Sequence, residues 1–322
     1  MSIPVNDCDI FDYYRTSRCL TTEDGLDFVS IVQDTPNPRK GAMAVSGVTL
    51  SLIENGWNDE RMLMLVNALR NENDDVIRER AIVGLLLVMM QYDSVIRSAG
   101  EMLDRVQDVL TEDPDLAFTA LCNIARTQHV DLVLKCNQRL AKDLLPLIQE
   151  RKTDEFVRVI NQHKNDMLNI ARLHLDQNFV FFQDAYQLPF FRERAAHWFL
   201  PWDEQALLNV PEEYREDVAE LLNRWAMCDS DKYALISNGM YKALRNAVQD
   251  RLQIESLREM GNAMERQELV TNNYVQQLYR FFRLSAFTQS HPFDLAKNLR
   301  QMIIFRLVVV GRRAQDVIGE LL

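Results

Sequence analysis

Apolar side chains recur every three or four residues along almost the whole chain, the spacing that places them on one face of an α-helix. Strict alternation of apolar and polar residues, the pattern of a half-buried strand, is nearly absent. Glycine and proline, which turn-rich all-β folds need, number only 10 and 9 among 322 residues. The pattern therefore predicts an all-α protein. The expected helices lie at residues 23–33, 38–53, 59–71, 75–91, 94–110, 114–127, 130–150, 154–175, 190–199, 212–226, 231–258, 263–284 and 294–310.

Three predicted helix starts are evenly spaced along the first part of the chain. Thr35, Asp74 and Asp113 are 39 residues apart, and each places a side-chain oxygen before a proline or an acid, as helix N-caps do. An alanine follows each cap after seven residues, where a helix would press against its neighbour. We expect five side chains to pack adjacent repeats together: Arg39, Ala42, Arg78, Ala81 and Ala120.

The middle unit reads LVNALRNENDDVIRERAIVGLLLVMM, with a leucine-rich first helix, an Asp-containing turn, and then a hydrophobic-Arg pair, Ala and Gly-Leu. This string resembles a HEAT repeat, a helical hairpin of about 40–47 residues. The resemblance covers about residues 22–128 and implies hairpins that stack into an α-solenoid. With Thr153 as the cap of a fourth unit, the HEAT-like region is expected to span residues 1–176. Guanidinium groups suit carboxylate pairs, so Arg78 and Arg80 are expected to tie adjacent repeats.

Residues 177–322 lose this period and are expected to form a second, irregular and aromatic-rich helical region. Nine of the 24 residues at 179–202 are aromatic. In one interpretation they form a buried elbow between two helical layers, bent at Pro189 and Pro201. In the other they line a groove that anchors a partner peptide or helix. The residues expected to bind that partner are Phe190, Phe191, Trp198 and Trp202.

Three strings of this second region, LPFFRERAAHWFLPW, CDSDKYAL and LYRFFRLS, resemble segments of large uncharacterised bacterial helical-repeat proteins. Those proteins carry tetratricopeptide-type repeats further along, so the resemblance implies that the chain continues into a longer protein. Repeat arrays need a polar capping unit, and the last residues, DVIGELL, end on apolar side chains. We expect weak self-association through this end, while the apolar segment 302–310 packs inward.

The net charge of −11 argues against a general nucleic-acid binder, since phosphate binding needs an excess of Lys and Arg. The charge is uneven. Residues 1–60 hold ten acidic and four basic side chains, whereas residues 271–322 hold three acidic and seven basic ones. This basic C-terminal quarter leaves one alternative open, a nucleic-acid-binding or repair protein that resembles the HEAT-like DNA glycosylases. The acidic repeats depart from that family, whose concave face is basic.

The sequence shows no catalytic or metal-binding motif. The five histidines form no HExxH pattern and do not pair with a cysteine at ligand spacing. His163 and His174 lie eleven residues apart, about 16 Å along a helix, too far to share one metal ion. The cluster Asp229-Ser230-Asp231-Lys232 is interpreted as a helix start capped by a serine or an aspartate. We therefore expect no catalytic residue, no cofactor and no metal.

The five cysteines are scattered and odd in number, which is typical of a reducing compartment. The opening MSIPVNDCDIFDYYR shows no secretory leader, and the longest apolar run, residues 82–90, is shorter than the roughly 20 residues that cross a bilayer. We expect a cytoplasmic, non-catalytic scaffold or interaction module that presents a helical-repeat surface to another protein. Nucleic-acid binding through the basic C-terminal quarter is the alternative.

Overall fold

The computed structural model describes residues 6–33, 36–71, 74–149, 155–224, 227–239, 266–288 and 293–295, and every regular element within these ranges is a helix. The all-α prediction is confirmed. The α-helices are α1 (Asp7–Thr16), α2 (Thr22–Val32), α3 (Pro38–Asn55), α4 (Asp59–Leu69), α5 (Asp75–Gln91), α6 (Asp93–Ser98), α7 (Gly100–Glu112), α8 (Pro114–Arg126), α9 (Val130–Gln149), α10 (Phe156–Arg172), α11 (Phe179–Ala185), α12 (Pro189–Glu193), α13 (Glu212–Arg224), α14 (Asp229–Ser237) and α17 (Arg266–Leu284). Short 3-10 turns are η1 (Thr127–His129), η3 (Ala195–Trp198), η4 (Glu204–Asn209) and η5 (Ala286–Thr288).

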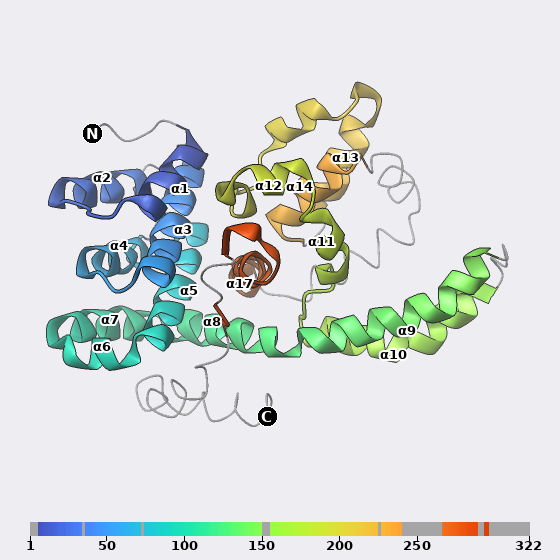
Figure 1. Cartoon of the computed structure of the whole chain (residues 1–322), viewed down its shortest axis with the longest axis horizontal. Helices are drawn as coiled ribbons and strands as arrows, with labels where there is room; N and C mark the ends of the chain where they lie inside the picture. The colour runs from blue at the N-terminus through green and yellow to red at the C-terminus, as the bar shows by residue number, and fades with distance from the viewer. Residues whose placement is uncertain are drawn as a thin grey trace.

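The first eight α-helices form two columns (Figure 1). In the inner column α1 packs on α3, α3 on α5, and α5 on α8, while in the outer column α2 packs on α4 and α4 on α7. The two columns also contact each other, since α2 packs on α3, α4 on both α3 and α5, and α7 on α8. This layering buries both faces of the inner helices, because α3 and α5 each have a neighbour above and below.

Polar contacts between successive layers join residues about 39 positions apart. Asn71 Nδ2 donates to the Val32 carbonyl at 2.8 Å, and Tyr92 Oη donates to the Leu52 carbonyl at 3.1 Å. The sequence separations of these pairs are 39 and 40 residues. The offset between layers thus agrees with the 39-residue spacing of the sequence pattern, although the assignment to HEAT repeats rests on resemblance.

Small residues allow the inner helices to approach closely. A Cβ atom at Gly47 of α3 would lie 2.5 Å from the Phe11 carbonyl oxygen of α1, closer than van der Waals contact permits. Ala42, Ala81 and Ala120, in α3, α5 and α8, are all fully buried. A larger side chain at these positions would have to displace its neighbours, because protein interiors are close-packed.

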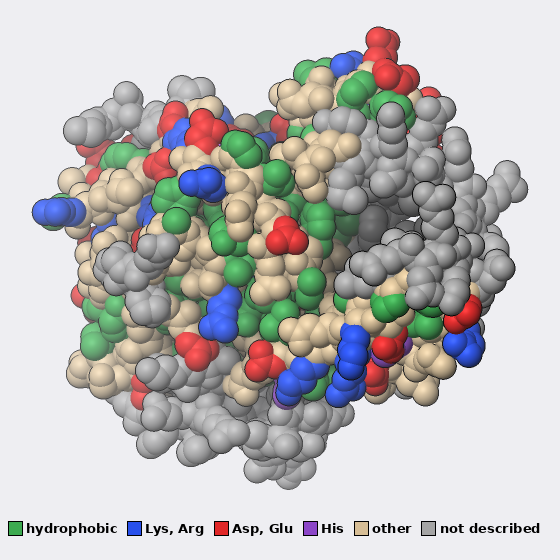
Figure 2. Space-filling model, turned by 45° about the vertical axis from the view of Figure 1, so that its right-hand side comes forward, with side chains coloured by type: hydrophobic (Ala, Val, Ile, Leu, Met, Phe, Trp, Pro, Cys, Tyr) green, Lys and Arg blue, Asp and Glu red, His purple; other side chains and the backbone are tan. Residues whose placement is uncertain are grey.

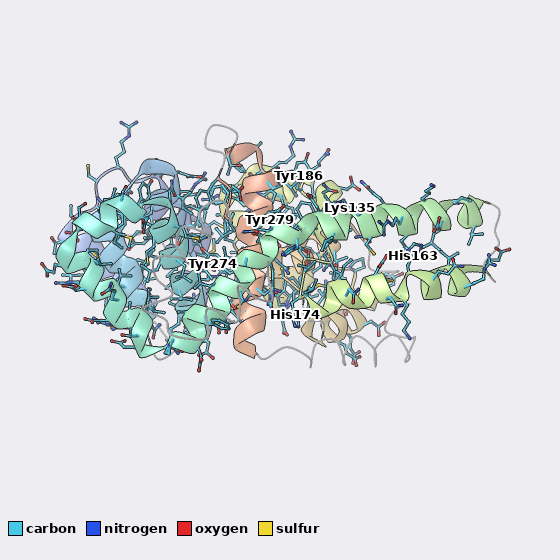
Figure 3. All side chains as sticks on the ribbon, turned by 90° about the horizontal axis from the view of Figure 1, so that it is seen from below. Lys135, His163, His174, Tyr186, Tyr274 and Tyr279 are labelled. Atoms are coloured by element: carbon cyan, nitrogen blue, oxygen red, sulfur yellow. The ribbon has the colours of Figure 1, made fainter. Side chains whose placement is uncertain are left out.

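Helices α9 and α10 pack against each other and form a hairpin that projects from the body, which we call the arm (Figures 1 and 3). The inner helix α8 leads into α9 through the 3-10 turn η1. Helix α17 lies in the middle of the molecule and packs against α5, α8 and α11. The root of the arm, near His174, therefore meets α17 (Figure 3).

One hydrophobic core runs through most of the molecule. It contains residues of the two columns, such as Phe11 and Leu85, together with Trp198, Phe199 and Phe281 from the aromatic stretch and α17. Phe199 stacks on Phe11 with ring centroids 5.5 Å apart and meets Phe281 edge-on at 5.0 Å. The predicted regions 1–176 and 177–322 thus share this core, and a boundary between them remains a prediction.

The predicted helix starts are correct at two positions and wrong at one. Asp74 and Asp113 cap α5 and α8, with carboxylates that accept hydrogen bonds from the amides of Ile77 at 2.9 Å and Leu116 at 3.0 Å. Thr35 lies outside the described residues, and it is not the cap of α3. That helix begins at Pro38 and its N-cap position is Asn37, because the proline supplies the preset backbone of a first helical residue.

Several predicted elements differ from the structure. Helix α1 was not expected, and neither was α11. The helix expected at 94–110 is two helices, α6 and α7, divided at Ala99. The helix expected at 190–199 is the short α12 followed by η3, because the Arg194 backbone between them is extended.

Two further predicted helices are described only in part. The start of the helix expected at 231–258 lies in α14, and residues 240–258 lie outside the described residues. Residues 296–310 of the helix expected at 294–310 lie outside them too.

Replacing Ala81 with leucine should destabilise the protein by about 1–3 kcal/mol, because the added atoms overpack the contact between α3 and α5. Ala42→Leu and Ala120→Leu should behave alike. Ala141→Leu, at an exposed position of α9, is the matched control. Urea unfolding followed by circular dichroism measures all four variants, and equal stability of Ala81→Leu and Ala141→Leu would contradict the packing described.

Candidate functional site

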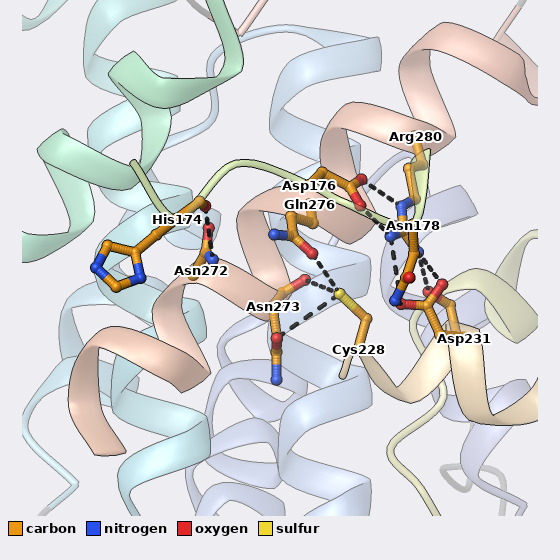
Figure 4. A network of polar contacts seen from close by, with 10 residues as sticks. His174, Asp176, Asn178, Cys228, Asp231, Asn272, Asn273, Gln276 and Arg280 are labelled. Carbon is orange, nitrogen blue, oxygen red and sulfur yellow. Dashed lines mark hydrogen bonds and ion pairs between the residues drawn. The ribbon is translucent and has the colours of Figure 1, made fainter. Parts of the chain in front are cut away.

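The most elaborate polar arrangement in the described residues surrounds Arg280 of α17 (Figure 4). This side chain is fully buried, and its guanidinium lies between two carboxylates. Its Nε donates to Asp176 Oδ2 at 2.6 Å, and its Nη1 donates to Asp231 Oδ1 at 2.7 Å. Nη1 also lies 3.3 Å from Ser230 Oγ. The ring of Phe182 covers the guanidinium, with its centroid 4.6 Å from Cζ.

The two carboxylates come from separate parts of the chain. Asp176 lies in the loop that joins the arm to α11, and Asp231 lies in the first turn of α14. Asn178 links them further, since its Nδ2 donates to Asp231 Oδ2 at 3.0 Å. Arg280 therefore fastens the root of the arm and the start of α14 to the central helix α17.

The charges of this cluster do not cancel, because one guanidinium faces two buried carboxylates. Burial raises the pKa of Asp176 above its ordinary value, although the charge and hydrogen bonds of Arg280 oppose that rise. Burial alone would lower the pKa of Arg280, but Asp176 and Asp231 more than offset this and raise it well above the usual value. Burial thus raises the pKa of Asp176, and the two carboxylates raise the pKa of Arg280.

Cys228 lies beside the cluster, at the N-cap position of α14, and is fully buried. Its Sγ donates to Gln276 Oε1 of α17 at 2.7 Å. Burial raises the pKa of this thiol well above its ordinary value. A thiol that stays protonated is a poor nucleophile, so the position of Cys228 is structural rather than reactive.

A small pocket, with room for about one water molecule, opens between α8, α17 and the root of the arm. Asp176 and Gln276 line it, and so do Arg126 and His174. The backbone of His174 has a φ of 50°, in the left-handed region that side chains other than glycine seldom adopt. Asn272 Nδ2 donates to the carbonyl of this residue at 3.3 Å, which helps to hold the turn.

The sequence interpretation of Asp229-Ser230-Asp231-Lys232 as a capped helix start is correct for the helix start and wrong for the cap. Helix α14 does begin at Asp229, but the cap position is Cys228 and no side chain makes a capping hydrogen bond there. Ser230 and Asp231 instead turn inward to Arg280. Local spacing could not show this, because the partner lies 49 residues further along the chain.

A second buried arginine, Arg80 of α5, holds the two columns to the aromatic stretch. Its Nη1 donates to Ser46 Oγ of α3 at 3.0 Å and to the Phe199 carbonyl at 2.8 Å, and the guanidinium lies over the ring of Tyr274. Burial lowers the pKa of Arg80. The expectation that this arginine ties neighbouring helices together agrees with these contacts, which reach further than the next layer.

The other predicted packing residues lie at helix junctions. Arg78 Nη2 is 2.9 Å from Asp113 Oδ2, so it joins α5 to the cap of α8. Arg39 at the start of α3 pairs with Asp7 of α1 at 3.2 Å and with Asp203, which precedes η4. Each of these arginines therefore forms an ion pair with a carboxylate outside its own helix.

The four aromatic residues expected to bind a partner differ in their exposure. Phe191 and Trp198 are fully buried, and Trp198 Nε1 donates to the Phe191 carbonyl at 2.9 Å. Phe190 and Trp202 are half-buried and pack against the ring of Tyr233. Phe191 and Trp198 offer no surface to another molecule in this conformation, so their burial favours the elbow interpretation over the groove.

The described residues hold no group of three His, Cys, Asp or Glu side chains that could bind a metal ion. His163 of α10 instead contacts Asp143 of α9 at 2.9 Å and so joins the two helices of the arm. Among the same residues, no helix is both long enough and apolar enough to cross a membrane.

Replacing Arg280 with methionine should destabilise the protein by about 3–5 kcal/mol, because it leaves two buried carboxylates without their cation. The control is Arg283→Met, an exposed arginine on the same helix, which should change stability by less than about 0.5 kcal/mol. Denaturant unfolding measures both. A similar loss in both variants would show that the cluster contributes nothing specific.

The raised pKa of Asp176 has a definite effect on stability. The native state binds this proton more tightly than the unfolded chain, whose value is near 3.8, so the associated stability is lost as pH rises through the native pKa. We expect the unfolding free energy of the wild type to fall, relative to that of Asp176→Asn, as pH is raised from about 4. Parallel pH profiles for the two proteins would contradict this assignment.

Comparison with family models found no match to this chain, and comparisons with curated proteins and with solved structures found none either. No relative therefore supplies a function by similarity.

Proposed function

We propose that the protein is a non-catalytic interaction module that binds another protein through a helical surface. The observation that carries this proposal is the arm, which projects from the body (Figure 1) and which exposes large apolar side chains to solvent. Leu132 of α9 is 45% exposed, Met167 of α10 is 43% exposed, and Leu173 at its end is 41% exposed. Exposed apolar groups that gather on one element are typical of protein-protein contact sites.

The two columns support an α-solenoid of HEAT-like hairpins as the scaffold for this arm. Inner and outer helices are layered, and polar contacts between layers join residues 39 and 40 positions apart. Arrays of this kind expose long continuous surfaces and serve widely as binding scaffolds. The fold alone does not imply the function, so the arm remains the decisive feature.

The chemistry of the interior supports a role without catalysis. Arg280 forms buried ion pairs with Asp176 and Asp231, and the thiol of Cys228 donates to Gln276. A catalytic group has to reach a substrate, whereas the pocket beside this cluster has room for about one water molecule. The ion pairs of Arg280 instead join α17 to the root of the arm and to α14.

Nucleic-acid binding gains no support from the described part of the basic C-terminal quarter. Arg280, one of its seven basic residues, is buried between two carboxylates and cannot reach a phosphate. Arg283 is exposed, but phosphate binding depends on several cations acting together.

The arm should be required for capture of a protein partner. The tagged protein should retain partner proteins from lysate of its host, and nuclease treatment should not release them. Replacing Leu132, Met167 and Leu173 together with serine should abolish capture while leaving the melting temperature nearly unchanged, because these side chains are exposed. Leu208→Ser, at an exposed leucine of η4, is the control and should capture normally.

Two results would contradict the proposal. Unchanged capture by the triple serine variant would remove the arm from the interaction. Release of the captured material by nuclease, with strong loss of binding as salt rises, would instead indicate a nucleic-acid partner.

A further inference from the structure

The five cysteines of the chain lie in unequal surroundings. Three of them, Cys8, Cys136 and Cys228, are buried, and burial raises the pKa of each thiol, at Cys8 to about 11. Cys122 is half-buried in α8. Cys19 is exposed, in the loop between α1 and α2. A reagent in solution can therefore reach Cys19 more readily than the other four thiols.

The loop that carries Cys19 contacts a buried arginine, Arg61 of α4. The side chain of Arg61 belongs to a residue that is only 3% exposed, and its Nη2 donates to the carbonyl of Ser17, two residues before Cys19. Leu20, the next residue after Cys19, packs against the hydrophobic core. The chain on both sides of the thiol is therefore held in place, with the guanidinium beside the loop.

Among the described residues, no carboxylate forms an ion pair with Arg61. The two acids that precede it, Asp59 and Glu60, are exposed, and neighbours one or two positions apart on a helix do not face each other. Asp59 instead accepts from Trp57 Nε1 at 2.6 Å. The Nε of Arg61 is buried and has no hydrogen-bond acceptor within the described part of the chain. The Ser17 carbonyl places this cation at the C-terminal end of α1, which is favourable, but a carbonyl carries no net charge.

Cys19 is the titratable group whose charge acts on this guanidinium. Burial lowers the pKa of Arg61, and the opposing effect comes from Cys19. Coulombic attraction is mutual, so Arg61 stabilises a negative charge on the sulfur of Cys19. The thiolate is the form of cysteine that attacks disulfides, and reactive cysteines lie in partly exposed positions beside a cation.

The charged residues closest to Cys19 along the chain are Arg18, Glu23 and Asp24. Arg18 is exposed and adjoins the thiol. The Asp24 carboxylate accepts from the amide and the hydroxyl of Thr21, at 2.6 and 2.7 Å, and from the Tyr13 hydroxyl. Glu23 is exposed, so solvent and salt screen its charge. Acidic and basic side chains are interspersed on the face shown in Figure 2, so close neighbours rather than a broad patch set the field at one thiol.

We propose that Cys19 is a modification site, at which the thiolate forms a mixed disulfide with a small anionic disulfide compound. The thiolate attacks one sulfur of the compound and a new S–S bond forms, while the original S–S bond breaks and its second sulfur leaves as a thiolate that takes up a proton from water. Arg61 stabilises the attacking sulfur, and Arg18 attracts the carboxylates of the incoming compound. This inference concerns neither the arm nor its partner, so it stands apart from the proposed function.

The reaction with dithiobis(nitrobenzoate), an aromatic disulfide with two carboxylates, tests the proposal. The native protein should show one fast-reacting thiol, which mass spectrometry of the modified peptides should identify as Cys19, and Cys19→Ser should lack the fast phase. Relative to N-acetylcysteine in the same solvent, this thiol should react about tenfold faster than a thiol of the urea-unfolded chain, because unfolding removes Arg61 from the loop. A native thiol that reacts no faster than the unfolded ones, or a fast phase that persists in Cys19→Ser, overturns the proposal.

Variants of Arg61 separate its charge from its place in the packing. Arg61→Gln should slow the fast thiol about tenfold, whereas Arg61→Lys, which keeps a cation, should recover most of the rate. The control Arg70→Gln removes an exposed arginine at the other end of α4 and should leave the rate within about twofold. Equal rates for wild type and a folded Arg61→Gln overturn the proposal, and circular dichroism checks the fold. If Arg61→Gln does not fold, the comparison of native with urea-unfolded wild type decides.

A neutral reagent isolates the contribution of Arg18. Arg18→Gln should slow the reaction with dithiobis(nitrobenzoate) about threefold and leave the reaction with hydroxyethyl disulfide unchanged, because only the first compound carries carboxylates. An unchanged rate with the anionic reagent would overturn the preference for an anionic disulfide.

Discussion

The described structure depends on one buried ion cluster, in which Arg280 is held between Asp176 and Asp231. The arginine belongs to the central helix, one carboxylate to the root of the arm, and the other to α14. Two charges of one sign against one of the other, all removed from water, are stable only with closely placed hydrogen bonds. Ser230 and Asn178 complete that set. The position of the arm on the body thus follows from electrostatics as much as from apolar packing.

Features decided by neighbouring residues could be predicted from the sequence. Asp74 and Asp113 were recognisable as caps, since a capping side chain bonds an amide three residues away. The buried alanines were recognisable by their period. The roles of Asp231 and Arg280 could not be predicted, because residues 49 positions apart meet only after folding. Helix α11 was missed because seven residues are too short to show a helical period.

The aromatic stretch shows how composition and structure complement each other. Its richness in Phe and Trp indicated either an elbow or a groove, and composition could not decide between them. The carbonyl of Phe199 accepts from the buried Arg80, and its ring stacks on Phe11 of α1. Arg194 adds ion pairs to Asp9 and Asp12 of the same helix, at 2.6 and 2.5 Å. The stretch is therefore fastened to the columns by both polar and apolar contacts.

The central position of α17 has a consequence for biosynthesis. The contacts that close the core join distant residues: Arg280 with Asp176, 104 positions away, and Thr271 with Asn123, 148 positions away. The columns make local contacts and can form as the chain leaves the ribosome. The surface of α5, α8 and α11 against which α17 packs stays uncovered until residues beyond 280 have emerged. Until then Phe182 and Trp198 lack the contacts that Arg280 and Phe281 of α17 make with their rings. Nascent chains halted before α17 should therefore be prone to aggregation. They are the form of the protein that depends most on a chaperone.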